Sequence, residues 1–157
     1  MKKVAILYRE YSPIIDAIKY QLADCVVDSL TELSGMGEYD LIVNLGSNYD
    51  GEALACHHAL LPAFNSEEPV RDAILSGVKV TGITIYYAKS KKIIAQYPVF
   101  INNNTHYEEL VQELDYIEQT LFPPVIHKVL NNEPFEVRAL LNKSCSGSCG
   151  GCSGCSH

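Results

Sequence analysis

Nearly continuous apolar runs alternate with amphipathic stretches along the first third of the chain. The runs at residues 3–8 and 39–45 are typical of strands buried on both faces of a parallel sheet. Between them, Ser12 and Pro13 form a helix-start signal, with Ser12 as the N-cap. Apolar residues then recur at helical spacing as far as Leu22. This stretch therefore predicts a strand, a helix and a further buried strand.

Two shorter elements are expected between that helix and the second buried strand. Residues 24–27 predict a short strand, and residues 29–33 predict a helical turn that ends at the following glycines. Strands that alternate with helices are typical of an α/β domain. We therefore predict an α/β fold with a doubly wound sheet.

The middle of the chain shows a different pattern. Residues 78–87 and 92–101 are rich in β-branched side chains, and only residues 88–91 separate them. So short a link cannot contain a crossover helix, because parallel strands need a dozen or more residues between them. The two strands should form a C-terminal antiparallel hairpin.

The last third of the chain begins with helical spacing. Residues 107–122 predict a helix that is interrupted at Pro123 and Pro124 and continues over residues 125–130. A last short strand is expected at residues 135–141. From Lys143 onward the composition is almost entirely Ser, Gly and Cys, which cannot pack a core. We predict one domain at residues 1–142 and a flexible tail, residues 143–157.

Composition and charge narrow the function classes. The 157 residues carry a net charge of −7, with a pI near 5.1, so no basic surface for nucleic acid or an anionic membrane is expected. No apolar run approaches the roughly 20 residues that cross a bilayer. The N-terminal apolar run is too short for a secretion signal, so a cytoplasmic location is expected. The expected partner is a protein or a small molecule of unknown identity.

Four of the six cysteines lie within the last 13 residues, whereas Cys25 and Cys56 are isolated in apolar surroundings and are expected to be small buried side chains. The spacing of the four allows neighbouring thiolates to reach one ion. They are Cys145, Cys149, Cys152 and Cys155. We predict that they bind a metal, either zinc or an iron–sulfur cluster. The alternative is a thiol-rich tail without a fixed ligand, as a redox or modification target.

Three motifs in the middle of the chain occur together in a known family. They are HHALLPAF at residues 57–64, GVKVTG at residues 77–82 and IIAQ at residues 93–96. With residues 39–132 around them, they resemble the folate-dependent formyltransferases, above all those that act on glycinamide ribonucleotide. The resemblance implies a formyltransferase-like fold and formyl transfer from 10-formyltetrahydrofolate to an amine. The first half is shorter than in the family, so that part of the fold should be truncated.

The residues that carry the family's chemistry are mostly replaced. His57 matches the family's histidine, but Ala55 occupies the position of its asparagine, and Tyr86 that of a second histidine. The short loop at residues 89–92 lacks the family's aspartate. His58, which follows His57, replaces a proline of the family and is expected at the surface. Loss of one oxyanion donor costs roughly 10²–10³ in turnover.

Two functions follow from this comparison. The first is a non-catalytic, formyltransferase-like pseudoenzyme whose tail binds a metal or iron–sulfur cluster. The alternative is an active phosphoribosylglycinamide-type formyltransferase that uses 10-formyltetrahydrofolate with His57 as acid/base. The segment at residues 8–13 favours the first, because it has no glycine and carries a carboxylate where the family cradles a phosphate.

Overall fold

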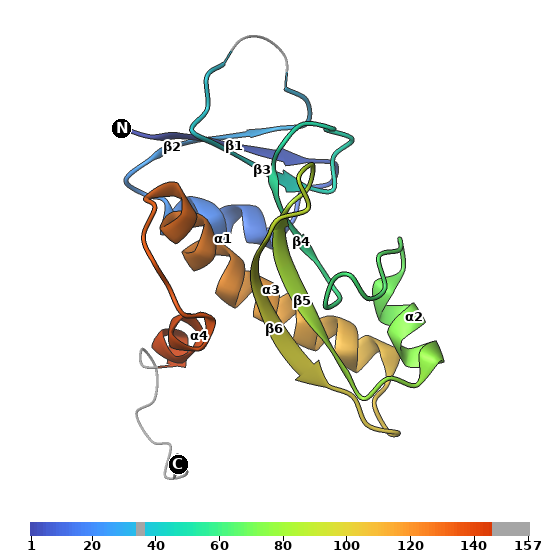
Figure 1. Cartoon of the computed structure of the whole chain (residues 1–157). Helices are drawn as coiled ribbons and strands as arrows, with labels where there is room; N and C mark the ends of the chain where they lie inside the picture. The colour runs from blue at the N-terminus through green and yellow to red at the C-terminus, as the bar shows by residue number, and fades with distance from the viewer. Residues whose placement is uncertain (34–36, 146–157) are drawn as a thin grey trace.

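The computed structural model describes residues 1–33 and 37–145, which form one six-stranded sheet with four helices (Figure 1). The strand order across the sheet is β2-β1-β3-β4-β5-β6. The elements are β1 (Lys3–Tyr8), α1 (Pro13–Gln21), β2 (Val26–Leu30), β3 (Leu41–Leu45), β4 (Leu54–His57), α2 (Pro69–Ser76), β5 (Val80–Tyr87), β6 (Ile93–Phe100), α3 (Tyr107–Leu130) and α4 (Val137–Cys145).

The sheet is parallel at one end and antiparallel at the other. β1 pairs in parallel with both β2 and β3, and β3 pairs in parallel with β4. The chain thus adds strands first on one side of β1 and then on the other, as in a doubly wound sheet. β4, β5 and β6 pair antiparallel in turn. The α/β class and the predicted hairpin are confirmed.

The first half of the sheet is built with unusually short links. The described parts of the link between β2 and β3, residues 31–33 and 37–40, contain no helix, and neither does the link at residues 46–53. Parallel strands are ordinarily joined by a dozen or more residues, usually with a helix. Here Asn44 holds the turn after β3, accepting hydrogen bonds from the N–H and the hydroxyl of Ser47 at 2.9 and 2.7 Å.

The long helix α3 covers the sheet and organises the core (Figure 1). It contacts α1, α2, α4, β4 and β5. Its buried face includes Phe122, which is fully enclosed, and both Pro123 and Pro124 lie inside the helix. The predicted interruption at these prolines is wrong, because the buried side chains on either side of them hold the helix in place. None of the described helices is long and apolar enough to cross a bilayer.

Two other secondary-structure predictions, at residues 135–141 and 29–33, are wrong. Residues 135–141 do not form a strand, because Val137, Leu140 and Leu141 have helical i, i+3, i+4 spacing and belong to α4. The domain boundary predicted after residue 142 stays a prediction; α4 itself ends at Cys145. The helical turn expected at residues 29–33 is also wrong, since Ser29 and Leu30 pair with β1 as the end of β2.

Candidate active site

The strand β4 carries different chemistry on its two faces. Side chains alternate along a strand, so Ala55 and His57 share one face and Leu54 and Cys56 the other. Across the β4–β5 pair, Ala55 lies opposite Tyr86 and His57 opposite Thr84. The resemblance places the transferase chemistry on the first of these faces.

On that face, the position of the expected oxyanion donor contains only a methyl group. Ala55 has no side-chain donor, and its cross-strand partner Tyr86 is a half-buried phenol. The ammonium group of Lys91 lies over the Tyr86 ring, 5.8 Å from its centroid. Burial, with the neighbouring Cys56, raises the pKa of Tyr86 above its ordinary value. This phenol therefore remains protonated at neutral pH and supplies no general base.

His57, the predicted acid/base residue, is tied to the turn that follows β4. Its Nε2–H donates a hydrogen bond to the carbonyl oxygen of Phe64 at 2.9 Å. Phe64 has a φ of 51°, so the bond supports a residue in a conformation that is costly for a bulky side chain. One ring nitrogen of His57 is thus committed to the backbone.

The turn itself is held by two polar side chains from the hairpin. The Thr84 hydroxyl donates to the carbonyl of Ala59 at 2.7 Å and accepts from the N–H of Leu61 at 3.0 Å. The Gln96 amide donates to the Leu61 carbonyl at 2.9 Å and to Thr84 Oγ1 at 3.1 Å. Gln96 belongs to the IIAQ motif, but its hydrogen bonds to this turn are not predictable from the motif alone.

The hairpin loop does not replace the missing aspartate. Residues 88–92 contain no carboxylate, and Ala88 bonds to the carbonyl of Ala53, at the far end of β4 from His57. Glu52 reaches the loop, but its carboxylate accepts hydrogen bonds from the N–H groups of Lys89 and Ser90 at 3.0 and 3.3 Å. Desolvation raises the pKa of Glu52, but the hydrogen bonds to Ser90 and Lys89 outweigh it and hold that pKa below its ordinary value.

The phosphate end of the expected site is also altered. In the first turn of α1, the Tyr11 hydroxyl donates to the Asp16 carboxylate. A carboxylate in the first turn of a helix interacts favourably with the helix dipole and disfavours a second anion beside it. Ser12 is the N-cap residue, as predicted, although its side chain makes no capping hydrogen bond.

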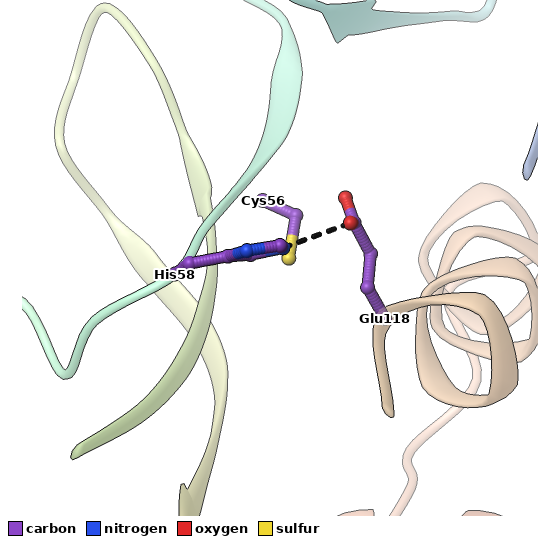
Figure 2. A group of neighbouring side chains, drawn as sticks. All are labelled: Cys56, His58 and Glu118. Atoms are coloured by element: carbon purple, nitrogen blue, oxygen red, sulfur yellow. Dashed lines mark hydrogen bonds and ion pairs between the residues drawn. The ribbon is translucent and has the colours of Figure 1, made fainter. Parts of the chain in front are cut away.

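The opposite face of β4 brings together three potential ligands. Figure 2 shows Cys56 and His58 directed from the strand side toward Glu118 of α3. His58 Nε2 lies 2.9 Å from Glu118 Oε2, and the ligand atoms of all three residues lie within 4.8 Å of one another. The expectation that His58 lies at the surface is wrong, because its side chain is only 21% exposed.

The electrostatics of this cluster follow from its burial. Burial, with the neighbouring Glu118 carboxylate, raises the pKa of the Cys56 thiol well above its ordinary value. Desolvation works to lower the pKa of His58, but the hydrogen bond to Glu118 and the charges of Glu118 and Asp115 outweigh it and raise that pKa. Without a bound ion, the surroundings therefore favour the protonated forms of both the thiol and the imidazole more than water does.

The predicted tail site can be followed only at its start. Cys145 is the last residue of α4, whereas Cys149, Cys152 and Cys155 lie outside the described residues. The remaining two cysteines, Cys25 and Cys56, are free and partly buried.

Comparison with known proteins agrees with this fold. Residues 41–126, more than half of the chain, match the family described as formyl transferase. The chain is 35% identical over 86 residues to phosphoribosylglycinamide formyltransferase of Bacillus subtilis, covering 52% of this chain and 44% of that protein. It is 33% identical over 107 residues to the enzyme of the same name from Mycobacterium tuberculosis, covering 59% and 50%.

The match thus spans about half the length of these curated relatives. Among solved structures, phosphoribosylglycinamide formyltransferase of Bacillus halodurans superposes with a TM-score of 0.64 at 24% identity, over 82% of this chain and 95% of that one. That likeness concerns the fold alone, whereas the sequence match covers the motif region itself. The chain belongs to the formyl transferase family.

Proposed function

We propose that this chain uses the formyl transferase fold without transferring formyl groups from 10-formyltetrahydrofolate, and that its tail binds a metal or iron–sulfur cluster. The observation that carries the first part is the pairing of Ala55 with Tyr86. It leaves a methyl group and a protonated phenol where the resemblance requires an oxyanion donor and a histidine.

The surrounding groups do not compensate for this loss. A tetrahedral intermediate needs donors aimed at its oxyanion and a route for protons. His57, at the end of β4, is bonded to Phe64, whereas Glu52, before the start of β4, is bonded to the hairpin loop. Within the described residues, Glu52 does not bond to His57, so it does not orient the imidazole as a carboxylate orients a catalytic histidine. The arrangement therefore supports a structural role for His57.

The first prediction is that the protein does not formylate glycinamide ribonucleotide at enzyme-like rates. Loss of one oxyanion donor lowers turnover by roughly 10²–10³, and loss of the acid/base partner lowers it further, although not additively. We expect kcat/KM at least about 10³-fold below that of the Bacillus subtilis relative, assayed side by side as the positive control.

The His57→Ala variant separates genuine turnover from background. Background formylation should be equal in the wild-type protein and in this variant. Steady turnover that disappears in His57→Ala would contradict the proposal and support the alternative, an active phosphoribosylglycinamide-type formyltransferase with His57 as acid/base.

The tail proposal rests on cysteine spacing. Cys149, Cys152 and Cys155 follow one another at C-x₂-C intervals, and Cys145 precedes them by four residues. Glycine and serine between the thiols let the backbone wrap around an ion. Four thiolates suffice for tetrahedral zinc or for a [4Fe–4S] cluster, and such a site would suit redox or metal handling.

The second prediction concerns the metal content of anaerobically prepared protein. An iron–sulfur cluster should give broad visible absorption that bleaches on reduction, whereas zinc should give a colourless protein. Either ligand should be lost when Cys149 and Cys152 are both changed to serine. The wild type should therefore carry about one more equivalent of zinc or of cluster than this double variant. Because thiolates bind metal and free cysteine has a pKa near 8.5, zinc uptake near neutrality should release protons and strengthen with pH.

The control for this experiment is Cys25→Ser, which removes a partly buried thiol outside the tail and should leave the metal content unchanged. A difference below about a tenth of an equivalent between wild type and the tail double variant, after reconstitution, would contradict the ligand proposal. The tail would then be a redox or modification segment.

A further inference from the structure

Three side chains with different donor atoms converge between β4 and α3. Cys56 and His58 are two residues apart and approach from the strand side, while Glu118 approaches from the middle of the helix (Figure 2). Their ligand atoms lie within 4.8 Å of one another. The Glu118 carboxylate faces both partners: it lies 2.9 Å from His58 Nε2, and its charge and hydrogen bonding help to raise the pKa of the Cys56 thiol.

The donor set matches the preferences of zinc. Zinc binds cysteine sulfur, histidine nitrogen and glutamate oxygen at roughly 2.0–2.3 Å, usually in a tetrahedron. Donor atoms at the corners of such a tetrahedron lie about 3.3–3.8 Å apart. The 2.9 Å between His58 Nε2 and Glu118 Oε2 must open by about 0.5 Å, which small side-chain rotations provide.

A fourth side chain is placed to orient the histidine. Asp115 precedes Glu118 by one turn of α3, and its Oδ1 lies 3.9 Å from His58 Nδ1. His58 thus directs one nitrogen toward Glu118 and the other toward Asp115. A carboxylate beside the non-ligating nitrogen is the usual support of a metal-bound histidine.

The cluster is partly enclosed yet accessible. The side chains of His58 and Glu118 are 21% and 18% exposed. A cavity of about 500 Å³ is lined by the consecutive residues Cys56, His57 and His58 and by Glu67 and Glu68. The acidic lining favours entry of a cation, and the cavity leaves space for a water molecule.

We propose that Cys56, His58 and Glu118 form a zinc site, with water as the fourth ligand, on the face of β4 opposite Ala55 and His57. Three protein ligands and an exchangeable water are the arrangement of zinc sites that act on small molecules rather than purely structural ones. Asp115 is a positioning residue for His58. The site is separate from the cysteine tail and uses none of its thiols.

Cobalt(II) titration of the full-length chain tests this proposal. The four tail cysteines, Cys145, Cys149, Cys152 and Cys155, are first changed to serine so that the tail supplies no thiolate. One equivalent of cobalt should then bind, with thiolate-to-cobalt charge transfer in the near ultraviolet and the strong visible bands of a tetrahedral ion. Zinc should displace the cobalt and abolish both signals.

Variants in the same background assign the ligands. Cys56→Ser should abolish the charge-transfer band, whereas Cys25→Ser, the matched control, should retain it. Glu118→Gln and Asp115→Asn should each weaken binding about 10–100-fold while leaving the circular dichroism spectrum unchanged. In the protein that keeps Cys56, His58 and Glu118, free zinc at a hundredfold excess over its dissociation constant should raise the Tm by roughly 5–11 °C.

Two outcomes would overturn the proposal. One is the absence of charge transfer at millimolar cobalt with the fold intact, which would leave the cluster as an ion pair beside a buried thiol. The other is a charge-transfer band that persists in Cys56→Ser, which would assign the metal to a different thiol.

Discussion

Replacement of Gly82 by alanine is expected to lower the free energy of unfolding by about 3 kcal/mol and the Tm by roughly 6–12 °C. A Cβ at this position would lie 2.0 Å from the carbonyl oxygen of Tyr97 and 2.8 Å from Leu60 Cδ2. The carbonyl belongs to the backbone of β6, so it cannot move without disturbing the β5–β6 pairing. Thermal denaturation followed by circular dichroism measures the change.

Gly77→Ala is the matched control for this substitution. Gly77 follows α2 with a φ of +76°, and an added Cβ there would have no atom within 4 Å. Its cost is therefore only the left-handed backbone conformation, about 1–2 kcal/mol. A Tm loss for Gly82→Ala no larger than that for Gly77→Ala would contradict the close approach of the turn and the two strands.

Features set by local pattern were predictable from the sequence. The first strand has the predicted bounds, because Lys3–Tyr8 is an apolar run with polar residues on both sides. The hairpin was predictable because four residues cannot contain a crossover helix. The motif at residues 57–64 indicates the family from the sequence alone, and the family match at residues 41–126 includes it.

Features decided by long-range packing were not predictable in this way. Residues 135–141 contain both a β-branched residue and helical spacing, and their contact with α3 settles the choice as helix. Proline disfavours a helix interior, yet Pro123 is buried between Phe122 and Val125, so the surrounding core outweighs the local preference. Local rules fail here because tertiary burial involves larger free energies.

The candidate site divides in the same way. His57 was predictable from its place in the motif. The replacements at Ala55 and Tyr86 were predictable from the same comparison with the family motif. Cys56 lies on β4 and His58 directly follows this strand, but the third member, Glu118, lies 60 residues beyond His58 in the sequence. Only the packing of α3 against β4 shows that these groups meet.

Thr84→Val is expected to lower the free energy of unfolding by about 3 kcal/mol and the Tm by roughly 6–12 °C. Thr84 is fully buried, and its hydroxyl bonds to Ala59, Leu61 and Gln96. Valine keeps the shape but leaves the buried carbonyl of Ala59 and the partly buried N–H of Leu61 without this partner, and each buried unpaired group costs about 1–3 kcal/mol. Denaturant unfolding and thermal unfolding both measure the loss.

Thr81→Val is the matched control, because Thr81 lies three residues earlier on the same strand and is equally buried. Within residues 1–33 and 37–145, its hydroxyl has no hydrogen-bond partner. Removing an unpaired buried hydroxyl should raise the free energy of unfolding by about 1 kcal/mol and the Tm by roughly 2–4 °C. The two substitutions are chemically identical, so opposite signs would come from the hydrogen bonds alone. Losses of equal size at both positions would show that Thr84 does not hold the turn that follows His57.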